Sequence, residues 1–294
     1  MSFSSDFDDI VTRGFPLGKA TTFGIGGPAE MLARPRSAEE LGRLLAAAGA
    51  EGLPVRLLGG GSNLLVADEG VKGLVVRLAG KAFASLEQAP AGLSAGAGVP
   101  LARLVREAAS AGLSGVENLA GIPGSVGGAL VMNAGGKYGY IGDVVEEVRA
   151  LESSGRPLVL GRAECGFGYR SSKLRGLTVT GARLALTPDR PEAVAERTRK
   201  VRAEKRRAQP MNRPSAGCVF KNPRPDLPAG RLIDELGFKG RRVGGAAVSD
   251  LHANYIVNLG GARCAEVLEL IAAIREAASR ERGIGLELEV EIWS

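Results

Sequence analysis

The chain has 294 residues and a formal net charge of +6 at pH 7, and its 43 glycines are about twice the usual share of that residue. A single histidine, His252, argues against a zinc site or a Ser-His-Asp triad. Three widely spaced cysteines give neither metal-ligand spacing nor a disulfide framework. The sequence shows no signal peptide and no apolar run of membrane-spanning length, so we expect a soluble, cytoplasmic protein.

The positive charge indicates an anionic partner. Nucleic acid is one candidate, but a nucleotide-sugar diphosphate, a dinucleotide cofactor or a carboxylate would use surplus arginine equally well. The scarcity of aromatic residues argues against single-stranded nucleic acid. Charge alone therefore leaves a binding protein and an enzyme both open.

The first third of the chain predicts an α/β layer. Ser37 is placed to cap a helix over residues 38–50, and residues 55–58 and 74–78 read as short buried strands. Three consecutive glycines, Gly59 to Gly61, follow the first of these strands and precede Ser62 and Asn63. Glycines are kept where a side chain would collide with something, so this turn suits a ligand loop, and taken alone it suits an unusual hairpin as well.

A second glycine-containing segment is a false lead. Gly96-Ala97-Gly98 precedes a helix, as in a dinucleotide-binding fingerprint, but Leu101 replaces the third glycine. Proline is common at the start of a helix, which accounts for Pro100. We therefore assign no cofactor to this segment.

The central stretch, residues 117–139, reads ENLAGIPGSVGGALVMNAGGKYG and holds seven glycines. Bare backbone N–H groups in such a loop suit an anion or a flat cofactor, as in phosphate-binding nests. A pair of tight turns between core strands is the alternative. Two glycine loops in one chain favour a large, diphosphate-bearing cofactor.

The second half of the chain predicts a β-rich lobe and then a further α/β domain. We expect strands at residues 144–151, 178–186 and 255–259, helices at 192–208, 229–237 and 267–283, and a half-buried final strand at 286–293. The helix over 192–208 is strongly basic, which is typical of a solvated face.

Several segments together closely resemble the UDP-N-acetylenolpyruvoylglucosamine reductase family. In chain order they are TFGIGG from Thr22, LGGGSNLLV from Leu58, ENLAGIPGSVGGALVMNAG from Glu117, GYRSSK from Gly168, PSAGCVFKNP from Pro214, and EVEI from Glu289. The resemblance implies an α+β fold: a two-lobed FAD-binding domain of the vanillyl-alcohol-oxidase/PCMH type over residues 1–190, with lobes of about 1–78 and 79–190. A C-terminal α/β substrate-binding domain over 191–294 follows.

The same resemblance implies non-covalent FAD, NADPH as co-substrate and no metal. It places the cofactor on Gly59, Gly60, Gly61, Ser62, Asn63, Leu64, Ala120, Gly121, Ile122, Pro123, Gly124, Val126, Gly127, Gly128 and Asn133. The implied reaction is reduction of UDP-N-acetylglucosamine enolpyruvate to UDP-N-acetylmuramate in peptidoglycan precursor synthesis. Tyr169, Arg202, Arg206 and Asn222 stand at substrate-contact positions.

Three residues match catalytic positions of the family. Arg170 and Glu289 would stabilise the enolate charge that follows hydride transfer, and Cys218 stands where the family's proton donor is usually serine. From the residues alone, Glu289 would read as solvated and Cys218 as a small buried hydrophobe. Glu291 stands where arginine is usual. The chain also lacks room for a tyrosine-bearing insertion, so it resembles the compact subtype.

Two rival functions remain at this stage. One is a related PCMH-type flavin oxidase of an alcohol or hydroxy acid, although the histidine that often tethers flavin in such enzymes has no candidate except His252. The other is a basic nucleic-acid-binding protein, supported only by charge and by the helix at 192–208. We expect a monomer.

Overall fold

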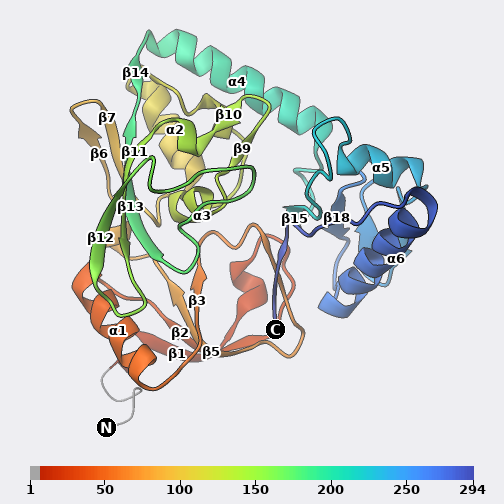
Figure 1. Cartoon of the computed structure of the whole chain (residues 1–294), viewed down its shortest axis with the longest axis horizontal. Helices are drawn as coiled ribbons and strands as arrows, with labels where there is room; N and C mark the ends of the chain where they lie inside the picture. The colour runs from red at the N-terminus through yellow and green to blue at the C-terminus, as the bar shows by residue number, and fades with distance from the viewer. Residues whose placement is uncertain (1–6) are drawn as a thin grey trace. The chain divides into compact units, whose positions relative to one another are not determined.

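The structure is a computed structural model that describes residues 7–294, and its chain forms two compact units. The first unit comprises residues 7–13, Met31–Gly60 and Gly73–Glu204, and the second Gly14–Glu30, Gly61–Lys72 and Lys205–Ser294. The elements of both units mix helix and strand, as Figure 1 shows. The α+β class expected from the sequence is confirmed.

A five-stranded antiparallel sheet organises the first unit, in the order β12-β11-β13-β7-β6. Its buried side chains pack with those of α2 and α3 in one hydrophobic cluster. Short strands β8 and β14 pair with each other, as do β9 and β10. The strands are β6 (Leu86–Ala89), β7 (Gly92–Gly96), β8 (Leu113–Ser114), β9 (Gly135–Gly136), β10 (Gly139–Tyr140), β11 (Val145–Leu151), β12 (Pro157–Gly161), β13 (Thr178–Ala185) and β14 (Thr187–Pro188), and the helices α2 (Leu101–Ser110) and α3 (Val126–Val131).

The predicted N-terminal α/β layer is present. A four-stranded sheet has the order β1-β2-β5-β3, in which β3 and β5 run parallel. Helix α1 lies between β2 and β3 in the chain, and the Ser37 side chain accepts a hydrogen bond from the Glu40 N–H at 3.1 Å, as the sequence predicted. The bounds are β1 (Val11–Pro16), β2 (Pro28–Ala33), α1 (Ala38–Ala50), β3 (Val55–Leu58) and β5 (Val71–Arg77).

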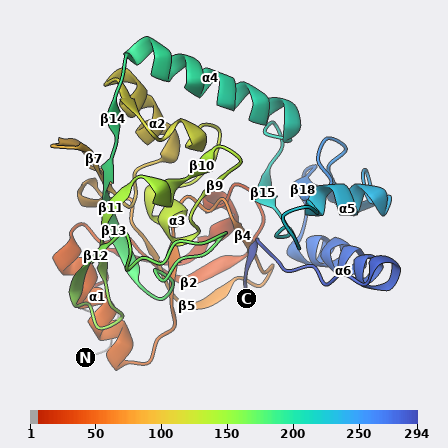
Figure 2. The same cartoon turned by 45° about the horizontal axis from the view of Figure 1, so that its top comes forward.

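The second unit is built on a four-stranded antiparallel sheet, β15-β18-β17-β16, with α5 and α6 contributing to its core. Figure 2 shows β15, β18, α5 and α6 in this part of the chain. Two further strands, β4 and β19, pair in parallel. The bounds are β4 (Leu64–Val66), β15 (Ser215–Cys218), α5 (Ala229–Glu235), β16 (Arg242–Val243), β17 (Ala246–Val248), β18 (Tyr255–Asn258), α6 (Cys264–Arg282) and β19 (Glu291–Trp293).

Three sequence predictions can be compared with the observed elements. The final strand is shorter than expected, because only Glu291–Trp293 pairs with a neighbour along its length, while Leu288 makes one isolated bridge to Phe220. The rejection of the Gly96-Ala97-Gly98 fingerprint is confirmed, since β7 is antiparallel to both of its neighbours. The long basic helix is confirmed as α4 (Pro191–Ala208).

Candidate active site

The two predicted glycine loops of the first unit lie against each other. A Cβ added to Gly60 would stand 2.6 Å from Gly124 Cα, and one added to Gly59 would stand 2.7 Å from Ser125 Oγ. Backbone therefore meets backbone at Gly60 and a serine hydroxyl meets backbone at Gly59, with no room for a further side chain at either position. Gly121 and Gly124 also have positive φ angles, of 78° and 124°, which suit glycine.

This double loop leaves N–H groups available to a ligand. Within residues 7–294, the backbone N–H groups of Gly59, Gly60, Gly121 and Gly124 donate no hydrogen bond to a protein acceptor. Such clustered donors suit the phosphates of a dinucleotide. The residues present thus fit FAD.

Other backbone donors of the predicted cofactor set are already used inside the protein. The N–H groups of Ala120, Ile122, Val126 and Gly127 donate to Glu117, Leu119, Val99 and Ala97 respectively. The Val126 side chain is fully buried. These four residues therefore stabilise the loop by internal hydrogen bonds, whereas Pro123 and Gly128 are exposed.

The remaining cofactor candidates of the first glycine loop belong to the second unit. Gly61 has φ 63°, and a Cβ there would lie 2.1 Å from the Ala20 carbonyl oxygen. Asn63 donates from its side-chain amide to the carbonyl of Glu289 at 2.9 Å, and its own carbonyl accepts from the Glu291 N–H at 2.9 Å. Leu64 is buried and pairs with Glu291. The segment after the glycines thus holds the C-terminal segment in place.

Arg170 occupies a strained turn in the first unit. Gly168 and Ser171 form an isolated antiparallel bridge, and Arg170 between them has φ 53°, which non-glycine residues rarely adopt. Its guanidinium donates from Nη1 to the Gly135 carbonyl at 3.0 Å and lies 5.5 Å from the Tyr169 ring centre. Such an outlier motivates a functional role.

Asn133 supports this turn. Its amide donates to the Gly168 carbonyl at 2.9 Å, while its Oδ1 accepts from the Gly142 N–H at 3.0 Å. Asn133 is buried and, like Arg170, has a positive φ, of 45°. Asn133 was predicted to contact the cofactor, and its side chain also orders the segment that carries Arg170.

Cys218 and Glu289 come together within the second unit. Both the Glu289 and Val290 N–H groups donate to the carbonyl of Val219, the residue after Cys218, at 2.8 and 3.3 Å. Asn254 fixes the same segment by a pair of hydrogen bonds with the backbone of Phe220. Cys218 and Glu289 are both half-buried. Glu289 is therefore not fully solvated and Cys218 is not fully buried, in contrast to what the residues alone suggested.

The four predicted substrate residues are all exposed. Arg202 and Arg206 stand four residues apart on α4, and within the described chain neither makes an ion pair. Asn222 accepts from the Ala229 N–H at 3.0 Å and so supports the start of α5. Tyr169 is 46 % exposed beside Arg170.

Sequence reasoning missed two features of this region. Ser125 lies between the glycine loops, and its position at the start of α3 after a positive-φ glycine could have indicated it. Glu117 is 9 % exposed and accepts hydrogen bonds from the Gly115 N–H, the Ser114 hydroxyl and the Arg197 guanidinium. The sequence treated Arg197 as part of a solvated basic face, but this arginine anchors the start of the glycine-rich stretch.

Among residues 7–294, no three His, Cys, Asp or Glu side chains form a group that could hold a metal ion. In that part of the chain no helix combines the length and the apolar character needed to cross a bilayer.

His252 packs edge-on against Tyr255, and burial lowers the pKa of its imidazole.

Comparisons with known proteins agree with this geometry. Residues 29–161 match a family model described as an FAD binding domain, and residues 209–293 match the C-terminal domain of UDP-N-acetylenolpyruvoylglucosamine reductase. The reductase of Moorella thermoacetica is 49% identical, covering 95% of this chain and 91% of that protein, and reductase 2 of Symbiobacterium thermophilum is 45% identical, covering 96% and 92%.

A solved structure leads to the same family. The crystal structure of the reductase from Thermus caldophilus has a TM-score of 0.84 and 46% identity, covering 97% of this chain and 98% of that one. The chain therefore belongs to the UDP-N-acetylenolpyruvoylglucosamine reductase family of FAD-dependent oxidoreductases.

Proposed function

We propose that this protein reduces UDP-N-acetylglucosamine enolpyruvate to UDP-N-acetylmuramate, with NADPH as the source of electrons. The observation that carries the proposal is the hydrogen bond from the Glu289 N–H to the carbonyl of Val219, the residue after Cys218, because it brings together the two segments that carry a proton donor and a carboxyl group. We assign residues 1–190 to the FAD-binding domain and 191–294 to the substrate-binding domain, in keeping with the matched ranges 29–161 and 209–293.

Bound FAD supplies the hydride that the enol ether accepts on its terminal vinyl carbon. The negative charge that develops toward the substrate carboxylate then needs a fixed cation. Arg170 supplies it, since a guanidinium stays charged and binds a planar anion in bidentate fashion. The strained turn fixes the backbone of Arg170, and the hydrogen bond to the Gly135 carbonyl holds its guanidinium beforehand, so little reorganisation is needed.

Glu289 shares this stabilisation in our proposal. Its backbone is held on both sides, by Val219 through its N–H and by Asn63 through its carbonyl, which limits where the carboxyl group can move. A protonated carboxyl group would donate a hydrogen bond to the developing enolate. Glu291, which replaces the usual arginine, lies in a different environment: its Oε1 accepts from the Trp293 indole at 3.2 Å.

Cys218 delivers the proton to the carbon next to the ether oxygen. A thiol with an ordinary pKa near 8.5 is a far stronger acid than the alcohol of serine, yet remains mostly protonated at neutral pH. The bond that breaks is S–H, and the bond that forms is C–H. The carbon gains the proton while the thiolate takes the electron pair.

Substrate phosphates bind Arg202 and Arg206, and Tyr169 and Asn222 complete the substrate contacts in this proposal. None of the three cysteines forms a disulfide within residues 7–294, which supports a cytoplasmic location. We also propose a monomer with non-covalent FAD. Acid precipitation of the protein would then release all the yellow colour into the supernatant.

The decisive experiment is anaerobic mixing of the NADPH-reduced enzyme with the enolpyruvyl nucleotide. Rapid reoxidation of the flavin, with formation of the muramate product, is expected. Mixing with buffer alone is the control. A flavin that stays reduced with the nucleotide but is reoxidised quickly by oxygen, in an enzyme that turns over alcohols, would instead identify a flavin oxidase.

A further inference from the structure

Asn254, which lies just before β18 in the second unit, is a polar residue that is only 3 % exposed. Its side-chain Oδ1 accepts from the Phe220 N–H at 2.9 Å, and its Nδ2 donates to the Phe220 carbonyl at 2.8 Å. Its backbone carbonyl also accepts from the Val219 N–H at 2.8 Å. One buried residue thus makes three hydrogen bonds to the two residues that follow Cys218.

The side-chain amide of Asn254 takes the place of a backbone partner. Strand β15 pairs with β18 only as far as Cys218, which lies opposite Tyr255. Beyond that pair, the amide satisfies both the N–H and the carbonyl of Phe220, as a peptide group of a neighbouring strand would. Buried backbone groups need such partners, because leaving them unpaired is costly.

The same short segment also holds the chain around Glu289. Phe220 forms an isolated antiparallel bridge with Leu288. Next to this bridge, the Glu289 N–H donates to the Val219 carbonyl at 2.8 Å. The segment is therefore bonded both to Asn254 and to the C-terminal part of the chain. Because the proposed proton donor precedes this segment and the carboxyl group pairs with it, its orientation decides how the two side chains lie relative to each other.

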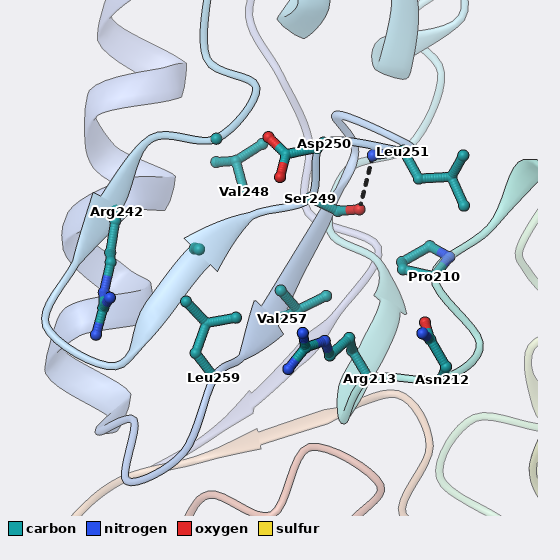
Figure 3. Close-up of a pocket in the computed structure, with 12 residues that line it drawn as sticks. Pro210, Asn212, Arg213, Arg242, Val248, Ser249, Asp250, Leu251, Val257 and Leu259 are labelled. Carbon is teal, nitrogen blue, oxygen red and sulfur yellow. Dashed lines mark hydrogen bonds between the residues drawn. The ribbon is translucent and has the colours of Figure 1, made fainter.

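The turn that carries Asn254 is itself held by hydrogen bonds. The Ser249 hydroxyl accepts from the Leu251 N–H at 3.2 Å, as Figure 3 shows, and from the His252 N–H at 3.4 Å. The Ser249 N–H donates to the Tyr255 carbonyl at 2.8 Å, and the Asn254 N–H donates to His252 Nδ1 at 3.2 Å. A side chain on such a turn is held in place before substrate binds, as a positioning role requires.

We propose that Asn254 is a positioning residue for proton delivery, because its amide fixes the segment that sets Cys218 against Glu289. The inference rests on the proposed function, in which these two side chains act on the substrate after hydride transfer. Asn254 acts through the backbone of Phe220 and does not take part in the chemistry itself. A displacement of about 1 Å at reacting groups can cost about a hundredfold in rate, so this support affects turnover strongly.

Asn254→Asp in the FAD-loaded enzyme tests the role of the amide donor. The variant keeps an acceptor for the Phe220 N–H but turns a carboxylate oxygen toward the Phe220 carbonyl. At pH 8, flavin reoxidation by the enolpyruvyl nucleotide should slow about ten- to hundredfold, and flavin reduction by NADPH should be unchanged.

Lowering the pH should restore the rate of Asn254→Asp relative to the wild type. Burial and the facing carbonyl raise the pKa of the introduced carboxyl group, and its protonated form can donate to the Phe220 carbonyl again. Burial lowers the pKa of the neighbouring His252, so the imidazole stays mostly neutral down to about pH 6.5. Asn254→Ala removes both side-chain bonds without adding a charge, so it should slow reoxidation at every pH, with no such recovery.

Asn258→Asp is the matched control. Asn258 is 9 % exposed at the other end of β18, and its Nδ2 likewise donates to a backbone carbonyl, that of Phe23, at 3.0 Å. Its Oδ1 accepts from the Gly260 N–H at 2.8 Å, so the two substitutions remove equivalent bonds. The control should lose similar stability and still be reoxidised at the wild-type rate. Equal slowing in both aspartate variants, a rate that does not recover as the pH falls, or a wild-type rate in Asn254→Ala overturns the proposal.

Alkylation of Cys218 gives a readout that needs no turnover. Cys165 and Cys264 are buried and Cys218 is half-buried, so alkylation of the native enzyme, located by mass spectrometry, reports on Cys218. It should be faster in Asn254→Asp than in the wild type, because the segment is loosened, and unchanged in Asn258→Asp. Such a difference in an enzyme unable to reduce the enolpyruvyl nucleotide would leave the positioning of Cys218 assigned and the proposed function refuted. Reduction of that nucleotide at wild-type rates, with unchanged alkylation, in both Asn254 variants would do the reverse.

Discussion

Replacement of Glu117 by glutamine should destabilise the first unit markedly. The Glu117 carboxylate is nearly buried and accepts from the Gly115 N–H at 2.6 Å, the Ser114 hydroxyl at 2.9 Å and the Arg197 Nε at 3.0 Å. Burial alone would raise the pKa of this carboxyl group. The hydrogen bonds from Gly115, Ser114 and Arg197 and from its own backbone outweigh burial, so the pKa lies below its ordinary value.

The expected magnitude follows from what glutamine cannot do. Its amide has one oxygen, so an NH₂ group must face a donor, either Gly115 or Arg197, and that donor loses its acceptor at position 117. One charge-assisted hydrogen bond and one unpaired group together cost about 2–4 kcal/mol. At about 2–4 °C per kcal/mol for units of 150–250 residues, the melting temperature should fall by roughly 5–15 °C.

Thermal unfolding followed by circular dichroism at pH 7.5 measures this effect. Glu276→Gln is the matched control, because Glu276 pairs with Arg280 on the surface and should contribute less than about 1 kcal/mol. A double-mutant cycle with Arg197→Met isolates the ion pair. An unfolding temperature for Glu117→Gln equal to that of the control would refute the reasoning.

The pH dependence supplies a second check on Glu117. A carboxyl group whose pKa is lowered on folding adds stability that is fully present above the ordinary glutamate pKa of about 4.3, and that is lost as the pH falls through its lowered value. The difference between the wild type and Glu117→Gln should therefore shrink below about pH 4. A difference that stays constant into acid would mean that packing, rather than charge, causes the loss.

Four further predictions concern the cofactor, the catalytic residues and the thiols. Gly124→Val should give colourless, flavin-free protein, since a φ of 124° is a backbone conformation that a residue with a branched side chain rarely adopts; a yellow preparation would contradict this. Arg170→Met and Glu289→Gln should each slow flavin reoxidation by substrate while leaving reduction by NADPH nearly intact, and equal loss in both half-reactions would indicate a structural role. Cys218→Ser should keep substantial activity and Cys218→Ala should lose roughly 10²–10⁴-fold in the reoxidation step, whereas near-normal turnover of the alanine variant would return Cys218 to a packing role. Burial and the nearby Asp68 and Glu69 raise the pKa of Cys264 to about 11, so this thiol should resist alkylation of the native enzyme at pH 8, as mass spectrometry can determine.

Local sequence determined many of the elements. Ser37 before an amphipathic run specified the N-cap of α1, and the basic helix α4 followed from residues 192–208 almost to the residue. The positive φ angles of Gly121 and Gly124 agree with the reading of a loop that only glycine tolerates. These features depend on a residue and its near neighbours, which is why a single sequence reveals them.

Tertiary structure decided what each glycine and each acidic residue meets. Position 60 requires glycine because Gly124 lies against it, and no local pattern encodes this contact between residues 64 positions apart. The alternation over residues 286–293 predicted one continuous strand, but only the last three residues found a full partner, in β4, because a strand exists only where a neighbour supplies hydrogen bonds. The sequence does not distinguish Glu289 from Glu287 and Glu291, which all lie on the polar side of the segment. In the structure Asn63, 226 residues earlier, donates a hydrogen bond to the carbonyl of Glu289. Sequence periodicity gives the side of a strand on which a residue lies, whereas the partner on that side is set by chain segments brought together only on folding.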